Sequence, residues 1–162
     1  MRLSRLRAVD KRNMLVVFLV TSCVYLNSLG SPFQYDDFHS IADNPHIRAL
    51  KNVPRFFSDP TLFSEREESA MFRPLLLTTF AINHAISGCE TWSYHVLNLA
   101  LHGVCALLVF GVGKSLLRDR RAALLAALLF GLHPANSEAV NYISSRSEIL
   151  AAFFFLIAFL LA

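Results

Sequence analysis

Cysteine is too scarce in this sequence to form a disulfide framework. The chain has three cysteines in 162 residues. Cys23 and Cys105 lie inside apolar runs and only Cys89 lies in a polar segment, so no pairing can be read from the sequence. The chain also lacks a surface on which basic and aromatic residues alternate, and despite a net charge of +3 nothing indicates a nucleic-acid partner.

Charged residues are absent from several long stretches. Apolar residues make up 54% of the chain, and the mean hydropathy is +0.45, which is above the range of ordinary soluble domains. We therefore predict an all-α fold of multi-pass transmembrane helices, with interfacial helices in the first outer loop.

Acidic residues are nearly absent from residues 1–13, where Asp10 stands against five Lys and Arg. An apolar run over residues 14–29 follows. A signal peptide would have a shorter apolar core and a small-x-small cleavage site, and the residues after this run match such a site poorly. A basic flank before a transmembrane helix favours the cytoplasmic side. We therefore predict a cytoplasmic N-terminus at 1–13, a retained first transmembrane helix at 14–30 and an outer loop at 31–92.

The predicted outer loop is more acidic than basic, with eight acids against five Lys and Arg. Asp-Asn-Pro at 43–45 and Ser-Asp-Pro at 58–60 mark turns. Between them, five apolar residues recur at near-helical spacing and predict a short amphipathic helix at the membrane interface: Ile47, Leu50, Val53, Phe56 and Phe57. The alternative is a disordered acidic loop, and the aromatic content argues against it.

Residues 93–162 are predicted to supply further transmembrane helices. The earlier run Leu75–Ile86 is too short to span and is predicted to be interfacial or re-entrant. Tyr94–Leu117 is a clear span whose basic end belongs in the cytoplasm, and Ala122–Leu132 returns outward. The last run, Ile149–Ala162, has 14 residues and is predicted to be too short to span. We therefore expect the sequence to be the N-terminal piece of a longer protein, incomplete at its C-terminus.

A polar stretch, residues 133–148, separates the last two apolar runs. Glu138, Tyr142 and Ser145 follow helical spacing, and Ser145 with Glu148 forms a capping-box pattern. The titratable residues exceed what an interfacial turn needs, and three are candidate site residues: His133, Glu138 and Arg146.

Two adjacent carboxylates, Asp36 and Asp37, follow the first apolar run. Like charges this close to a bilayer persist where solvent, a cation or chemistry provides a partner. The alternative is a simple turn, which Asp and the preceding Gly-Ser-Pro favour. With His39 the pair could also hold a divalent metal, although we expect no metal here.

Four motifs follow one another along the chain. They are Phe33–Pro45, running from Phe-Gln-Tyr-Asp-Asp to Asp-Asn-Pro; Arg73-Pro74-Leu75; Tyr94-His95-Val96-Leu97-Asn98 with Leu101-His102; and His133-Pro134 with Ser137-Glu138-Ala139-Val140 and Ser145-Arg146-Ser147-Glu148. In this order and spacing they resemble the membrane domain of the TMTC proteins (transmembrane and tetratricopeptide-repeat-containing proteins) and their bacterial relatives. The Ser-Arg-Ser-Glu ending resembles the bacterial branch, which favours the bacterial inner membrane, or the endoplasmic reticulum membrane if the source is eukaryotic.

The resemblance implies a GT-C glycosyltransferase fold with an active site at the outer membrane face. Such enzymes transfer a sugar, in the TMTC case mannose, from a polyprenyl-phosphate donor to a hydroxyl of an acceptor protein, and they need no cofactor. By position, Asp36 or Asp37 matches the general base, and we favour Asp36. Arg73 and Arg146 stand at outer boundaries where a guanidinium could bind the donor phosphate. His39, His133 and Glu138 are the other site candidates, and the lipid tail of the donor would lie against the spans.

Two other functions are open to such a chain. One is a non-catalytic membrane scaffold that presents a C-terminal tetratricopeptide array; that array and the family's later helices lie outside this sequence, so we expect these residues alone to be inactive. The other is a transporter. Asn98 and His102 are the main polar residues inside a span, and their i, i+4 spacing is more typical of a helix–helix contact than of an ion path.

Overall fold

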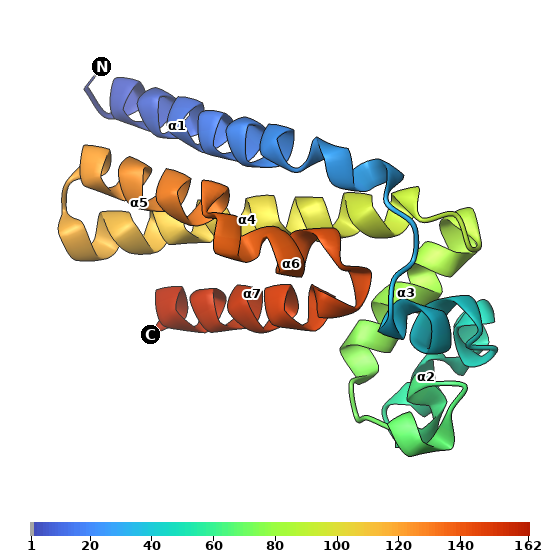
Figure 1. The fold of residues 1–162 in the computed structure, drawn as a ribbon. Coiled ribbons are helices and arrows are strands. Elements are labelled where there is room, and N and C mark those ends of the chain that lie inside the picture. Colours follow the sequence, from blue (N-terminus) through green and yellow to red (C-terminus); the bar gives the residue numbers. More distant parts are fainter. Residues whose placement is uncertain (1) are drawn as a thin grey trace.

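The computed structural model describes residues 2–162, with side chains for residues 10–66 and 68–162. Four long helices form a bundle (Figure 1): α1 (Arg2–Val24), α4 (Trp92–Leu117), α5 (Arg120–Leu132) and α7 (Arg146–Leu161). A short helix, α6 (Ser137–Asn141), connects α5 to α7. No strand occurs among residues 2–162, and the predicted all-α fold class is confirmed.

Small residues let the bundle helices approach closely. A Cβ atom added to Gly113 of α4 would lie 3.1 Å from the Cα of Ala123 in α5, tighter than ordinary contact. Ala106, Ala123 and Ala127 are fully buried beside Val17 of α1. Small side chains at helix crossings are typical of membrane bundles, where close van der Waals packing replaces the hydrophobic drive.

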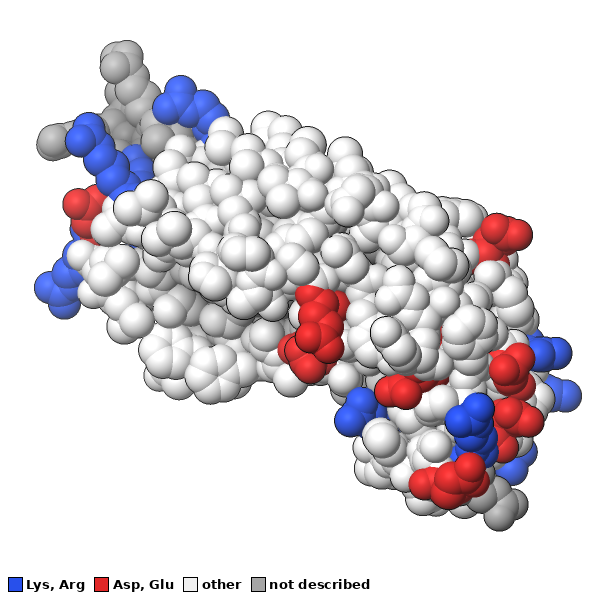
Figure 2. All heavy atoms as spheres, in the orientation of Figure 1, with Lys and Arg blue, Asp and Glu red and all other residues white. Residues whose placement is uncertain are grey.

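Within residues 2–162, two helices are long and apolar enough to cross a membrane, Trp92–Leu117 and Ile143–Leu161. A third span is formed if Arg120–Leu132 and Pro134–Asn141, which meet at a bend of 46°, are counted as one. The expectation that the last run is too short to span is wrong: the polar turn before it continues into the same helix, which reaches 19 residues. Figure 2 shows Lys and Arg gathered toward the two ends of the molecule, and an acidic patch interrupts the otherwise uncharged surface between them.

The first apolar run is not one uniform helix. Its α-helical part belongs to α1, which begins at Arg2 within the basic segment, and residues Leu26–Gly30 continue as a 3-10 turn. The boundaries of the basic segment at 1–13 and the first span at 14–30 stay predictions. Met1 and the side chains of residues 2–9 lie outside the described part of the chain.

The outer loop folds into a compact lobe beside the bundle (Figure 1). Its core joins loop residues such as Ile41, Ile47 and Phe56 to α3 (Pro74–Ser87), which contributes Leu77 and Phe80. The loop is therefore ordered, as its aromatic content indicated, and the disordered alternative is excluded. At 14 residues α3 is too short to span, as the sequence indicated.

The single amphipathic helix predicted in this loop is replaced by short turns. These are the 3-10 segments His46–Arg48 and Leu50–Asn52 and the four-residue helix α2 (Val53–Phe56). The backbone of Ala49 is extended, with φ −136° and ψ 119°, and this interrupts the spacing. Ile47 and Phe56 are buried, but Leu50 is exposed.

The stretch 133–148 is not one helix either. Tyr142 is extended, with φ −98° and ψ 119°, and separates α6 from the 3-10 turn Ile143–Ser145. Ser145 does precede α7, but its side chain makes no capping hydrogen bond, so the predicted capping box is wrong. The break at Tyr142 turns the polar residues after it toward the outer loop.

Candidate functional site

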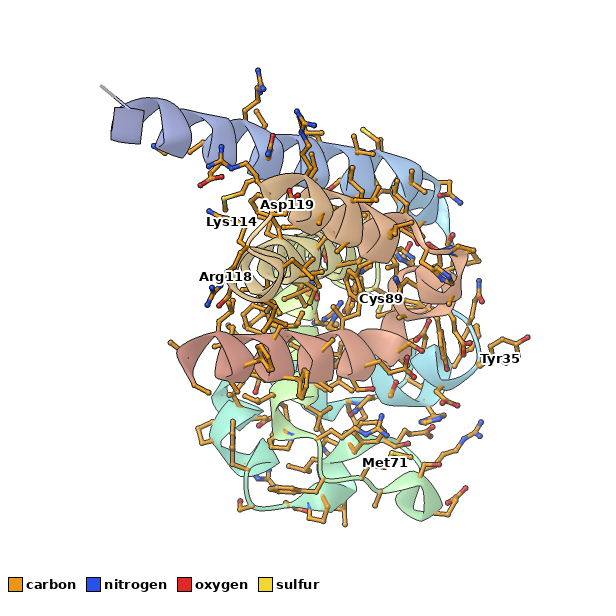
Figure 3. The ribbon with its side chains drawn as sticks, turned by 90° about the vertical axis from the view of Figure 1, so that its left-hand side faces the viewer. Tyr35, Met71, Cys89, Lys114, Arg118 and Asp119 are labelled. Atoms are coloured by element: carbon orange, nitrogen blue, oxygen red, sulfur yellow. The ribbon has the colours of Figure 1, made fainter. Side chains whose placement is uncertain are left out.

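The segment that carries Asp36 docks on the turn before α7. The backbone N–H of Asp36 donates to the Tyr142 hydroxyl at 2.9 Å, and the rings of Tyr35 and Tyr142 pack edge to face with centroids 6.2 Å apart. Tyr35 has a φ of 42°, rare for a residue with a side chain, and such strain concentrates at functional sites. Tyr35 is 82% exposed, and its side chain projects from the molecule (Figure 3).

Asp37 fastens the loop to this turn. Its Oδ1 accepts from the backbone N–H of Ser144 at 2.9 Å and from the Ser144 hydroxyl at 2.6 Å, and its Oδ2 accepts from the N–H of Gln34 at 3.0 Å. The residue is 1% exposed. Burial raises the pKa of Asp37, and the hydrogen bonds from Ser144 and Gln34 oppose that rise.

Asp36 has the opposite surroundings, because its side chain is 65% exposed. It lines an open pocket of about 370 Å³ between the loop and the start of α7. His39 Nε2 lies 3.4 Å from Asp36 Oδ1, while His39 Nδ1 lies 2.9 Å from the Ser64 hydroxyl. When Nε2 carries the proton, Ser64 can donate to Nδ1 and the imidazole holds the Asp36 carboxylate toward the pocket.

Arg73 lines the same pocket, at the point where α3 begins. Its Nη1 donates to the Ser147 hydroxyl at 3.3 Å, and its guanidinium carbon lies 5.9 Å from the centre of the Phe63 ring. These contacts leave several of its N–H groups available to a ligand. The pocket therefore offers an exposed carboxylate and an exposed guanidinium to one bound molecule.

An apolar groove of about 340 Å³ adjoins this pocket. Arg73 and Ser147 line both. The remainder of the groove is formed almost entirely by apolar side chains of α3 and α7 and the segment before α3: Phe72, Pro74, Leu75, Leu76, Leu150, Ala151 and Phe154. A polar head and an apolar chain on one ligand would fit the two cavities together.

Arg146 does not lie in this pocket, and its predicted contact with a donor phosphate is wrong. It is fully buried, with Nε donating to Asn98 Oδ1 at 2.6 Å and Nη1 donating to Thr79 and Asn83, each at 2.8 Å. Its Nη2 donates to the Tyr94 carbonyl at 3.0 Å. The guanidinium is thus held by protein groups, and no phosphate can reach it in this conformation.

The other two candidates lie apart from Asp36. Glu138 is exposed and lines a second pocket of about 460 Å³ on the other side of Tyr142. His133 lines neither pocket; its Nδ1 accepts from the N–H of Ala135 at 3.2 Å at the start of a 3-10 turn. The structure thus brings together Asp36, His39 and Arg73, and leaves His133 and Glu138 outside.

The proposed metal alternative also needs the two aspartates together. Asp37 is turned to Ser144 and Gln34, which leaves Asp36 and His39 as neighbours. Within the described residues, no group of three or more His, Cys, Asp or Glu side chains is placed to hold a metal ion.

Sequence reasoning missed the serines of this pocket. Ser144 and Ser147 line it with Tyr142 and Glu148. The density of hydroxyl groups between Tyr142 and Glu148 is the signal in the sequence, and helix spacing and capping do not account for it. The same reasoning predicted a packed role for Asn98 and His102, and both bind across helices: Asn98 binds Arg146, and His102 Nε2 lies 3.1 Å from the Gly131 carbonyl.

The chain is similar to known proteins along most of its length. It is 37% identical over 149 residues to the human protein O-mannosyl-transferase TMTC3, which covers 90% of this chain and 16% of the relative. It is 37% identical over 142 residues to the mouse protein O-mannosyl-transferase TMTC2, covering 85% of the chain and 17% of the relative. A protein O-mannosyl-transferase of Caenorhabditis elegans is 32% identical over 161 residues, covering 96% of the chain and 23% of the relative.

The chain therefore spans less than a quarter of the length of these relatives. No family model matches the sequence. No solved structure matches it either.

Proposed function

The chain belongs to the TMTC family of protein O-mannosyl-transferases, and on that premise we propose that it contributes the reaction pocket of a membrane glycosyltransferase. The enzyme would transfer mannose from a polyprenyl-phosphate donor to a hydroxyl of an acceptor protein. One observation carries the proposal: an exposed carboxylate and an exposed guanidinium share a pocket that opens into an apolar groove.

Asp36 is the proposed general base. An alcohol is a weak nucleophile until a base takes its proton as the bond to sugar carbon C1 forms. In this reaction the acceptor oxygen bonds to C1, the bond from C1 to the phosphate oxygen breaks, and the polyprenyl phosphate leaves with the bonding electrons. The acceptor proton passes to Asp36. His39 orients that carboxylate and does not itself contact the sugar.

Arg73 is the proposed phosphate ligand. The leaving phosphate gains negative charge as the bond breaks, and a guanidinium can bind two of its oxygens at once. Because Arg73 lines both cavities, a phosphate bound to it would place the first isoprene units in the groove between α3 and α7. The positive charge comes from the protein, so the proposed reaction requires no divalent metal or other cofactor.

The proposed location follows from the same arrangement. The pocket lies on the side of the outer loop, and a lipid-linked donor reaches it from the surrounding bilayer. We place that loop outside the cytoplasm, at a bacterial inner membrane, or in the lumen of the endoplasmic reticulum for a eukaryotic source.

The test is mannose transfer by the full-length protein in membranes, with labelled polyprenyl-phosphate mannose as donor. Asp36→Asn keeps the shape of the side chain but removes the base, and we expect turnover to fall about 10²- to 10⁴-fold. Arg73→Gln should raise KM for the donor and lower kcat.

Glu90→Gln is the matched control, because Glu90 is an exposed acid of the same loop that does not line the pocket. Membrane levels of all variants are equalised before the comparison. Wild-type turnover in both Asp36→Asn and Arg73→Gln would refute the catalytic proposal and favour a scaffold that carries a repeat array.

A further inference from the structure

Another large pocket lies at the opposite end of the bundle from the outer lobe. Its volume is about 580 Å³. It lies between α1 and the start of α5, where Figure 3 shows Lys114, Arg118 and Asp119 close to the α4–α5 turn. Its lining comes from two parts of the chain: Arg12, Asn13, Asp119, Arg120, Arg121 and Leu124.

The acids at this end already have partners. Asp10 binds Lys114 at 2.6 Å and Arg120 at 3.0 Å, which ties α1 to α4 and α5. Asp119 caps α5, because its Oδ1 accepts from the N–H groups of Arg121 and Ala122 at 2.7 and 3.4 Å.

Two cations of the pocket have no such partner. Arg12 and Arg121 form no ion pair with any side chain of residues 10–66 or 68–162, and both side chains are exposed. The pocket therefore presents two unpaired guanidinium groups, because Arg120 is paired with Asp10 and the one carboxylate of the lining, Asp119, is engaged at the helix start.

One apolar side chain lines the pocket, and exposed leucines lie a helical turn away on α1 and α5. Leu124 forms part of its wall, and Leu15 and Leu125, on α1 and α5 close to it in sequence, are 58% and 60% exposed. A ligand that satisfies both features has a negative head and apolar chains. A soluble anion would use the guanidinium groups and leave the leucines in contact with bulk lipid.

We propose that this pocket binds the phosphate headgroup of an anionic phospholipid, with its acyl chains along α1 and α5. Arg12 and Arg121 reach the phosphate oxygens from two helices, so a bound lipid bridges them. Basic pockets between membrane helices recognise such headgroups, and each cation near an anionic lipid surface adds a similar increment to binding. The site is independent of the proposed mannose transfer, which uses the other end of the molecule.

The test measures lipid retained by the purified protein in native mass spectrometry after exchange into micelles that contain phosphatidylglycerol or phosphatidylcholine. We expect one phosphatidylglycerol to be retained in preference to phosphatidylcholine. The double variant Arg12→Gln/Arg121→Gln should bind phosphatidylglycerol roughly 25-fold more weakly, because each cation contributes about fivefold to the affinity.

The matched control is Lys11→Gln/Arg118→Gln. It removes the same net charge from exposed residues at the same end, but neither residue lines the pocket. We expect it to retain phosphatidylglycerol nearly as well as the wild type, because its two charges do not contact the headgroup and counter-ions screen them.

Three results would overturn the proposal. Equal losses of phosphatidylglycerol in the two double variants would show a diffuse charge effect. Retention of phosphatidylcholine equal to that of phosphatidylglycerol would show that the site does not select the headgroup. Displacement of the lipid by millimolar inorganic phosphate would show a site for a free anion. Thermal unfolding of each variant in lipid-free detergent verifies that the bundle is intact.

Discussion

Asp36 and Asp37 are adjacent in sequence, but their carboxylates have different surroundings. Asp36 is exposed to the pocket, whereas Asp37 is buried and accepts three hydrogen bonds. The sequence predicted a carboxylate pair and left open which residue faces the site. That choice depends on the positive φ of Tyr35 and on contacts with Ser144, more than 100 residues away, which no local pattern contains.

At Asp37 we predict a pH-dependent contribution to stability. Because burial raises the pKa of Asp37 in the folded protein, the folded state holds a proton that the unfolded state releases between the two pKa values. Stability should therefore increase as pH falls through the folded pKa of Asp37, and be lost as pH rises through it. Asp37→Asn, which does not titrate, should remove this component.

The measurement is the thermal midpoint of the detergent-purified protein between pH 4 and 8. Subtracting the profile of Asp37→Asn from that of the wild type cancels the groups that both share. Parallel profiles would contradict the prediction. In membranes, Asp37→Asn should lower protein levels more than it lowers turnover per molecule, the reverse of Asp36→Asn.

At the scale of the elements, Arg146 joins three helices. It binds Thr79 and Asn83 of α3 and Asn98 of α4 from the first residue of α7, and its guanidinium carbon lies 4.9 Å from the centre of the Phe80 ring. Hydrogen bonds from a charged donor are each worth about 1.5–3 kcal/mol, and buried acceptors left without a donor add a further cost.

We predict that Arg146→Lys destabilises the protein by about 3 kcal/mol or more, because an ammonium cannot make the planar set of contacts. Unfolding in detergent measures the loss, and Arg118→Lys at the exposed α4–α5 turn is the control. If Arg146 bound the donor phosphate instead, Arg146→Lys would raise the KM for donor while leaving stability unchanged.

The sequence predicted the helices of the bundle better than the connections between them. The long apolar runs predicted α4 and most of α7, because a helix that crosses a membrane must be apolar and of sufficient length. The lobe and the α6–α7 connection were not predictable in detail, because the extended backbones of Ala49 and Tyr142 interrupt the helical spacing of the sequence. Arg146 was misplaced because a charged residue at a helix start is ordinarily exposed, and its burial is tolerable only because side chains and a carbonyl of α3 and α4 accept its hydrogen bonds.

At the scale of the whole molecule, the order of helices places three segments at one end. The start of α1, the α4–α5 turn and the C-terminus lie together, while the lobe lies at the other end (Figure 1). The basic residues of the first and second of these segments would then share one side of the membrane. The positive-inside rule makes that side the cytoplasm, but sidedness itself stays a prediction.

Single cysteines test this topology in a background where Cys23, Cys89 and Cys105 are replaced by Ser. A membrane-impermeant maleimide added outside sealed cells or vesicles of known orientation should label Ser58→Cys in the lobe at once. Ser115→Cys, beside the α4–α5 turn, should be labelled only after the membrane is permeabilised. Both positions are exposed in the fold, so protection reports the bilayer and not burial. The reverse pattern would invert the topology and move the Asp36 pocket to the cytoplasmic side, away from the compartment proposed for its donor.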